Sequence, residues 1–140
     1  MKIIIDTNLW ISFLIGKKLP ILKTLLSTSS LTIYVCAQLV DEIKNAAGKS
    51  KIRKYITEAD VIAFLELIDA YCKHEVLRKQ AVSPVRDIND LYLLSLAETV
   101  AADFIITGDK DLLSLQSHQQ TGIVTYSIFI SIISEYGSLV

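Results

Sequence analysis

The sequence has few of the residues that interrupt regular structure or cross-link a chain. Its 140 residues include two prolines, five glycines and two cysteines. So little proline and glycine argues against linkers and low-complexity tracts, and favours long helices and strands joined by short loops. Two cysteines, Cys36 and Cys72, cannot form a disulfide framework. We expect both to be small buried hydrophobic residues in a reducing compartment.

Neither sign of charge dominates, and no apolar run is long enough to span a membrane. Lys and Arg total 14 against 15 Asp and Glu, for a formal net charge of -1, which excludes a broad basic surface for nucleic acid. A transmembrane helix needs about 18 apolar residues with few charges. The apolar N-terminus is interrupted by Asp6 and Asn8 and has no small-residue cleavage site, unlike a signal peptide. We therefore expect a soluble cytoplasmic protein with no membrane association.

Apolar residues, in contrast, make up 51% of the chain. The length fits a single domain over residues 1–140 that can bury about two thirds of its unfolded surface. Strands are expected where apolar runs are short, at residues 2–5, 31–36, 75–77, 103–107 and 123–125. Helices are expected between them, at residues 7–15, 20–26, 38–47, 57–72, 88–101, 111–115 and 127–136. This alternation predicts an α/β fold in which a mostly parallel sheet of four to five strands has helices on both faces.

Acidic residues follow the strands of this predicted sheet. Asp6 comes directly after the first strand, and Asp109 and Asp111 follow a later one. If the two strands are neighbours, these acids converge in the crevice where α/β sheets form their sites. Asp87 and Asp90, three residues apart at the start of a helix, can also face one point.

One further acid must be chosen from the neighbours Asp41 and Glu42. The apolar face of their helix is formed by Leu39, Val40, Ile43, Ala46 and Ala47. At about 100° per residue, Asp41 points away from the centre of this face, and Glu42 lies at its edge. We expect Asp41 to be a solvated charge and Glu42 to be held against the body of the protein.

Carboxylates gathered in one pocket repel each other and need compensation, which a divalent cation supplies. Oxygen ligands without Cys or His favour Mg²⁺ or Mn²⁺ over Zn²⁺. Structural roles remain open, because Asp87, Asp90 and Asp109 can each stabilise a helix N-terminus and Asp6 can cap the first helix.

Several segments together resemble the PIN domain family, and within it the branch of toxin components of toxin–antitoxin systems (VapC-like). They are IIIDTNLWISFLI, DEI, RDINDLYLLSLAETVAADFIITGDKDLLSL and IVTYSIF, in the order and spacing of the family. The resemblance implies a three-layer α/β/α sandwich and a Mg²⁺- or Mn²⁺-dependent ribonuclease, with RNA as its substrate.

The same resemblance assigns roles residue by residue. It implies four catalytic, metal-binding acids, namely Asp6, Glu42, Asp90 and Asp109. It adds Asp87 and Asp111 as further metal-binding acids, and Asn8, Thr107 and Ser12 as supporting polar residues. No motif acid is missing, so the resemblance implies an active enzyme.

Charge and apolar content suggest how substrate and partners bind. Five bases within eleven residues, Lys44, Lys49, Lys51, Arg53 and Lys54, can form a clamp for the RNA backbone, or a solvated loop. The closing helix and the first helices carry more Leu, Ile and Phe than a small core needs, which predicts a homodimer or a groove for an antitoxin peptide.

Other functions are weighed against the nuclease. A non-catalytic PIN-like module that binds RNA or protein would keep the fold and lose the chemistry. A phosphatase with an aspartyl nucleophile usually has a second Asp two residues on, where this chain has Asn8. A dinucleotide site would need a glycine-rich turn after a strand. We expect His74 and His118 to have surface or packing roles, and Trp10, Tyr34, Tyr71 and Tyr92 to be core residues.

Overall fold

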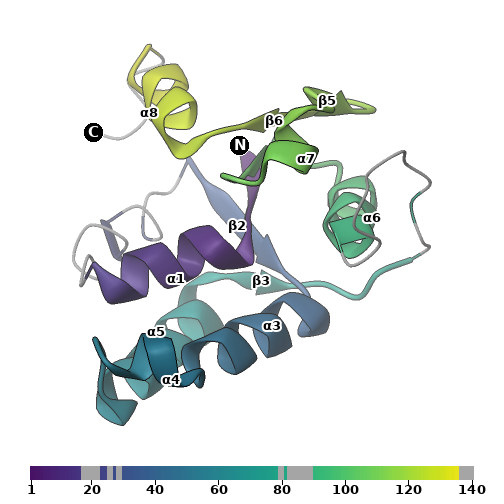
Figure 1. The fold of residues 1–140 in the computed structure, drawn as a ribbon. Coiled ribbons are helices and arrows are strands. Elements are labelled where there is room, and N and C mark those ends of the chain that lie inside the picture. The colour runs from purple at the N-terminus through teal and green to yellow at the C-terminus, as the bar shows by residue number, and fades with distance from the viewer. Residues whose placement is uncertain (17–22, 25–26, 28–29, 79–80, 82–89, 136–140) are drawn as a thin grey trace.

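The computed structural model describes residues 1–16, 23–24, 27, 30–78, 81 and 90–135, and these form one α/β fold around a central sheet (Figure 1). The described residues form six strands in the order β3-β2-β1-β4-β6-β5. Their bounds are β1 (Lys2–Ile5), β2 (Thr32–Val35), β3 (Lys73–His74), β4 (Phe104–Ile106), β5 (Ser117–His118) and β6 (Thr121–Val124). All neighbours pair in parallel except β5 and β6. The predicted mostly parallel sheet is confirmed.

The strand count is higher than the four to five expected, because the sequence does not signal β5. This strand pairs antiparallel with β6 across a tight turn in which Gln119 has a φ of 53°. Hairpin turns with positive φ usually use Asn-Gly or Asp-Gly, and this turn has neither. The short strand expected at residues 75–77 is found two residues earlier, as β3.

Seven described helices connect or flank the strands, and most begin close to where the sequence predicts. They are α1 (Thr7–Ile15), α3 (Ala37–Ala47), α4 (Ser50–Arg53), α5 (Glu58–Tyr71), α6 (Leu91–Val100), α7 (Lys110–Leu113) and α8 (Tyr126–Glu135). The short α4 was not predicted, and most of the helix expected at 20–26 lies outside the described residues.

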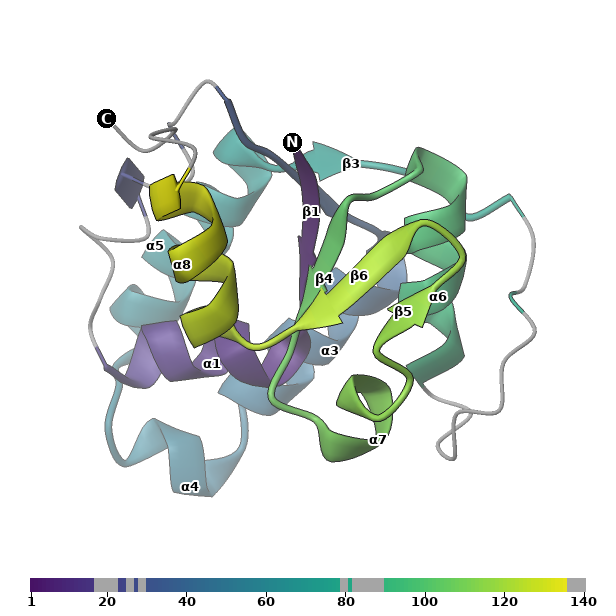
Figure 2. The ribbon, with the colours of Figure 1, turned by 90° about the horizontal axis from the view of Figure 1, so that it is seen from above.

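The helices form two layers, one on each face of the sheet. Figure 2 shows α6 on one side of β1 and β4, and α1 and α8 on the other. On the α1 side, aromatic pairs join the helices to one another. Trp10 of α1 meets Phe64 of α5 with ring centroids 5.9 Å apart, and Phe13 meets Tyr126 of α8 at 5.4 Å. Edge-to-face pairs of this kind add to the stability that burial already supplies.

Most of the apolar excess lies inside the protein. The three isoleucines of β1 are at most 1% exposed, and Phe129 and Ile133 of α8 are fully buried. The closing helix therefore contributes part of its apolar surface to the core, while Ile128 is 51% exposed and Tyr126, Ile130 and Ile132 are half-buried. Both cysteines are buried, as predicted, and burial raises the pKa of the Cys72 thiol to about 12. Tyr71, expected in the core, is 40% exposed.

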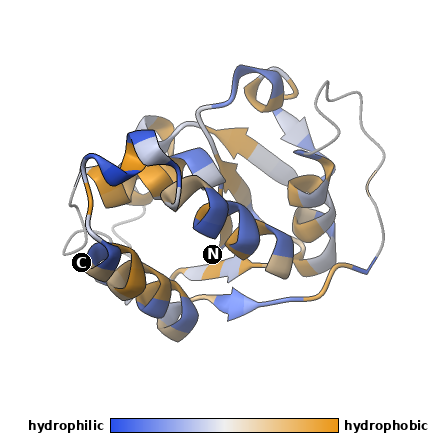
Figure 3. Cartoon of the chain, turned by 60° about the horizontal axis from the view of Figure 1, so that its bottom comes forward, coloured by the Kyte–Doolittle hydropathy of each residue, from blue (hydrophilic) through white to orange (hydrophobic). Residues whose placement is uncertain are grey.

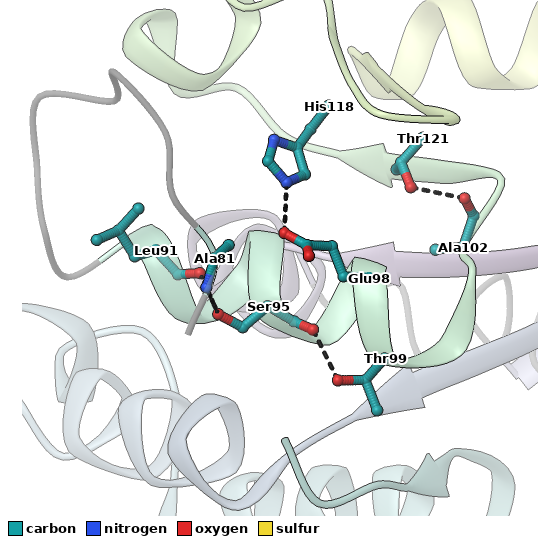
Figure 4. Close-up of polar contacts among 8 residues, drawn as sticks. All are labelled: Ala81, Leu91, Ser95, Glu98, Thr99, Ala102, His118 and Thr121. Atoms are coloured by element: carbon teal, nitrogen blue, oxygen red, sulfur yellow. Dashed lines mark hydrogen bonds and ion pairs between the residues drawn. The ribbon is translucent and has the colours of Figure 1, made fainter. Parts of the chain in front are cut away.

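Polar contacts fix α6 between the sheet and the chain before it (Figure 4). The hydroxyl of Ser95, which is 1% exposed, accepts a hydrogen bond from the Ala81 N–H at 2.8 Å. Glu98 pairs with His118 of β5 at 2.7 Å, so this histidine is not isolated. Each helix carries both hydrophilic and hydrophobic residues (Figure 3), and no described helix is long and apolar enough to cross a membrane.

Candidate active site

The carboxyl ends of β1 and β4 meet because the two strands are parallel neighbours. The Asp6 N–H donates to the Ile106 carbonyl oxygen at 3.0 Å, so backbone pairing continues to the residue after β1. A pocket of about 270 Å³ opens at this edge of the sheet. Its walls come from segments far apart in the sequence and are formed by Asp6, Thr7, Asn8, Glu42, Asn45, Ala46, Lys49, Asp90 and Asp109.

Asp6 is the most buried acid of the pocket, with only 7% of its surface exposed. Its Oδ2 accepts a hydrogen bond from the Thr107 hydroxyl at 2.7 Å. Burial raises the pKa of Asp6, and the negative charges of Asp109 and Glu42 raise it further, against the lowering effect of the Thr107 bond. Asp6 stands at the N-cap position of α1, yet its side chain makes no capping hydrogen bond. Capping therefore does not account for this buried carboxylate.

Glu42 enters the pocket from α3 and is held by two hydroxyl groups. Tyr92 donates to Glu42 Oε2 at 2.6 Å, and Thr7 donates to the same oxygen at 3.0 Å. Burial raises the pKa of Tyr92, and its bond to Glu42 raises it further, so the phenol stays protonated and remains a donor. Asp41, in contrast, is exposed. The helical periodicity therefore separated the two neighbouring acids as predicted.

Asp109 has two structural contacts beside its place in the pocket. Its Oδ1 accepts hydrogen bonds from the Asp111 and Leu112 N–H groups, so it caps α7. Its own N–H donates to the hydroxyl oxygen of Thr107, the same hydroxyl that donates to Asp6. Thr107 is 1% exposed and joins the two acids. Asp109 therefore caps α7, as the structural alternative predicted, and its side chain also lines the pocket.

Three of the four acids lie at helix N-termini. Asp6, Asp90 and Asp109 are the N-cap residues of α1, α6 and α7, and Asp90 makes no capping hydrogen bond with its side chain. The partial positive charge of a helix N-terminus favours a nearby carboxylate. The helix ends therefore offset part of the repulsion between the acids.

The remaining predicted residues are not all at the pocket. Asn8 and Lys49 line it, and Thr107 lies behind Asp6. The described pocket wall does not include Asp111, whose N–H contacts Asp109, or Ser12, whose hydroxyl donates to the Asn8 carbonyl at 3.0 Å. The other four bases, Lys44, Lys51, Arg53 and Lys54, are exposed and lie outside that wall. Asp87 is outside the described residues.

Sequence reasoning missed three polar residues of the pocket region. Tyr92 was expected to be only a core residue, and Thr7 and Asn45 were not singled out. Tyr92 comes two residues after Asp90, and Thr7 directly follows Asp6. Asn45 lies three residues after Glu42, which puts it on the same side of α3. All three lie within three residues of a predicted acid in the sequence, and this closeness could have identified them as pocket residues.

The donor set fits a hard divalent cation that keeps much of its water. All four acids offer oxygen ligands, the type that Mg²⁺ and Mn²⁺ prefer. Among the residues the structure describes, no three acidic, histidine or cysteine side chains stand close enough to form a ready-made metal cluster. Mg²⁺ usually binds through one or two carboxylates and several waters, so an open pocket of this kind suits it.

Comparison with known proteins agrees with the fold. A family model described as PIN domain matches residues 2–111 of the chain. The chain is also 30% identical over 128 residues to the uncharacterized protein MJ1680 of Methanocaldococcus jannaschii, an alignment that covers 86% of this chain and 78% of that protein.

Proposed function

Because the chain belongs to the PIN domain family, whose members are generally nucleases, we propose that it is a metal-dependent endoribonuclease that hydrolyses RNA phosphodiester bonds. One observation carries the proposal: four carboxylates from four separate segments, Asp6, Glu42, Asp90 and Asp109, line one pocket. Burying several like charges together is costly unless a cation compensates for them.

The four acids of the pocket would bind the metal ion together. Asp6, Asp90 and Asp109, with Glu42 acting partly through water, are the residues that would hold Mg²⁺ or Mn²⁺. When bound, such an ion supplies Lewis acidity that makes water more acidic and stabilises negative charge on the phosphate and the leaving oxygen. Thr107 keeps Asp6 Oδ2 fixed through its 2.7 Å bond. Water attacks phosphorus in line with the leaving oxygen, so no covalent enzyme intermediate forms.

The position of Lys49 is an argument that the substrate of this acidic pocket is a nucleic acid. Lys49 lines the pocket two residues after the end of α3, the helix that carries Glu42, and is the N-cap residue of α4. A Lys ammonium beside carboxylates can bind a phosphate of the RNA backbone without reading the bases. The other four bases, Lys44, Lys51, Arg53 and Lys54, are close to Lys49 in the sequence and are exposed. We propose that they bind further phosphates of the RNA backbone outside the pocket.

The decisive test is cleavage of RNA by wild-type protein and the Asp6→Asn variant. With Mg²⁺ or Mn²⁺ present, wild-type protein cuts RNA and Asp6→Asn loses at least about 100-fold in rate, because a buried ligand charge is removed. Asp41→Asn is the matched control, since it removes an exposed acid from α3, and its rate equals that of wild type. Equal cleavage by wild type and Asp6→Asn would remove the proposed mechanism.

One observation favours a second candidate, a PIN-like module that binds RNA or protein without cutting. The described acids do not form a compact metal cluster by themselves. Calorimetric titration with Mn²⁺ separates the two functions. An active site binds the ion, and an Asp6→Asn/Asp90→Asn variant does not, whereas a non-catalytic module gives no heat with either protein.

We also propose that the protein is the toxin of a toxin–antitoxin pair and forms a homodimer. A groove of about 340 Å³ lies between α3 and α5, and its lining includes the apolar residues Val40, Leu65 and Ile62, which is 50% exposed, beside Lys44, Glu66, Asp69 and His74. Exposed apolar grooves are typical of association surfaces. Growth should stop when wild-type protein, but not Asp6→Asn, is expressed. A monomer in light scattering, both alone and with the product of a neighbouring gene, would count against both the dimer and the antitoxin.

A further inference from the structure

Two side-chain hydroxyl groups donate to one oxygen of Glu42. Tyr92 lies 2.6 Å and Thr7 lies 3.0 Å from Oε2. A carboxylate oxygen has two lone-pair directions, so these two donors fill the hydrogen-bonding capacity of Oε2. The remaining hydrogen-bonding and metal-binding capacity of the carboxylate is therefore that of Oε1.

Both donors are buried. Tyr92 is 6% exposed in α6, and Thr7 is 8% exposed in the first turn of α1. Glu42 itself is only partly buried. A glutamate at the pocket wall is therefore hydrogen-bonded to two side chains that are more deeply buried than it is.

Each donor is also next to another acid of the pocket. Thr7 directly follows Asp6, and Tyr92 is two residues beyond Asp90. The position of each donor is therefore linked through the backbone to the position of one of these acids. The contacts span 35 and 50 residues of sequence and join α3 to α1 and α6. They set the place of Glu42 relative to two of the other three acids.

We propose that Tyr92 and Thr7 are positioning residues that hold Glu42 with Oε1 directed to the cation site. This inference rests on the proposed metal-dependent function and adds two residues to it. Partners that orient a metal-binding carboxylate typically change metal affinity or activity 10- to 100-fold when they are removed, about as much as some direct ligands do. Neither residue needs to touch RNA for this effect.

The test compares variants that remove one hydroxyl with variants that keep it. Tyr92→Phe and Thr7→Val each delete one donor and keep almost the same shape, whereas Thr7→Ser keeps the hydroxyl. Tyr34→Phe is the matched control, because Tyr34 is a buried tyrosine of β2, 8% exposed, outside the pocket wall. Thermal unfolding of each variant, with Mn²⁺ omitted, shows that the fold is kept.

The first readout is Mn²⁺ affinity, measured by calorimetry without RNA. Tyr92→Phe and Thr7→Val should bind Mn²⁺ about 10-fold more weakly than wild type, and Thr7→Ser and Tyr34→Phe should bind within about twofold of it. The second readout is RNA cleavage at a fixed, limiting Mn²⁺ concentration. There kcat should fall for the two deleting variants while KM for RNA stays unchanged.

The outcomes distinguish this inference from the function on which it rests. If wild type binds Mn²⁺ and cuts RNA, and Tyr92→Phe and Thr7→Val match it in both measurements, the positioning role is wrong and the nuclease stands. A loss in Thr7→Ser equal to that in Thr7→Val would mean that packing, not the hydroxyl, matters at residue 7. If wild-type protein neither binds Mn²⁺ nor cuts RNA, both the function and the positioning role are overturned.

Discussion

At the scale of single residues, Asp6 is an acid whose ionised form is disfavoured by burial. The side chain is 7% exposed, and its pKa is raised chiefly by burial. Functional acids are often less stable choices than their neutral counterparts, because the site needs the charge more than the fold does. The same burial that makes the charge of Asp6 costly also shields its carboxylate from water.

We predict that Asp6→Asn raises the free energy of unfolding at neutral pH in metal-free buffer, because burial opposes the charge of Asp6 and raises the pKa of its carboxyl group. The amide oxygen can still accept the Thr107 hydroxyl, and the like charges of Asp109 and Glu42 no longer act on residue 6. Urea unfolding of both proteins in EDTA measures the difference. A destabilised Asp6→Asn would mean that the charge contributes to the fold.

The pH dependence of that difference follows from the direction of the pKa shift. The native pKa of Asp6 lies above its ordinary value of 3.8, so between these two values the native state holds a proton that the unfolded state has released. The unfolded state binds fewer protons there, and stability falls as pH rises through this window. The advantage of Asp6→Asn over wild type should therefore be absent below about pH 4 and grow above it. A constant difference from pH 3 to 7 would contradict the assignment.

At the scale of elements, α5 shows how a local signal fixes a helix start. Thr57 and Asp60 form a reciprocal capping box, in which the Asp60 N–H donates to the Thr57 hydroxyl at 3.1 Å. Both residues were recognisable from their spacing, because a capping box needs only a short polar side chain and an acid three residues later. At the start of α6, the N-cap residue Asp90 makes no capping hydrogen bond with its side chain and lines the pocket.

We predict that Thr57→Ala costs about 1 kcal/mol of stability, the usual loss for an N-cap, while RNA cleavage stays at the wild-type rate. The cap lies on α5, which contributes no residue to the described pocket wall. Thr57→Ser is the control, since it keeps the capping hydroxyl and should unfold within a few tenths of a kcal/mol of wild type. Reduced cleavage in a folded Thr57→Ala would link α5 to the site.

At the scale of the whole molecule, a net charge of -1 conceals an uneven distribution. Acids gather at the carboxyl ends of the strands, and bases follow Glu42 along residues 44–54. Only Lys49 of those bases lines the pocket among the described residues. A neutral total therefore argues against a broad electrostatic attraction to RNA, and it leaves room for a local contact beside a cation.

We predict that Lys51→Ala/Arg53→Ala/Lys54→Ala weakens RNA binding and flattens its salt dependence. Each lost phosphate contact on single-stranded RNA lowers the slope of log affinity against log salt by about 0.7, so three contacts amount to roughly 2. Fluorescence anisotropy with uncut RNA, in Ca²⁺ or with Asp6→Asn protein, measures the slope. An unchanged slope would mean that these exposed bases are a solvated loop.

The sequence was sufficient for features that depend on periodicity and on neighbours along the chain. Alternating strands and helices determined the α/β fold, and acids at the ends of strands marked the edge where the pocket lies. The separation of Glu42 from Asp41 needed only the helical repeat, because one turn of helix decides which of two adjacent residues meets the protein body.

The tertiary structure decided which residues, distant in the sequence, form hydrogen bonds to the same atom. Thr7 and Tyr92 both reach Glu42 Oε2, and one Thr107 hydroxyl joins Asp6 to Asp109. It also placed Phe129 and Ile133 of α8 in the core and formed the β5–β6 hairpin through a turn, Gln119–Gln120, that has no glycine. Such contacts depend on strand order and on how helices pack, and no local pattern encodes them, because they join residues that are up to 50 positions apart in the sequence.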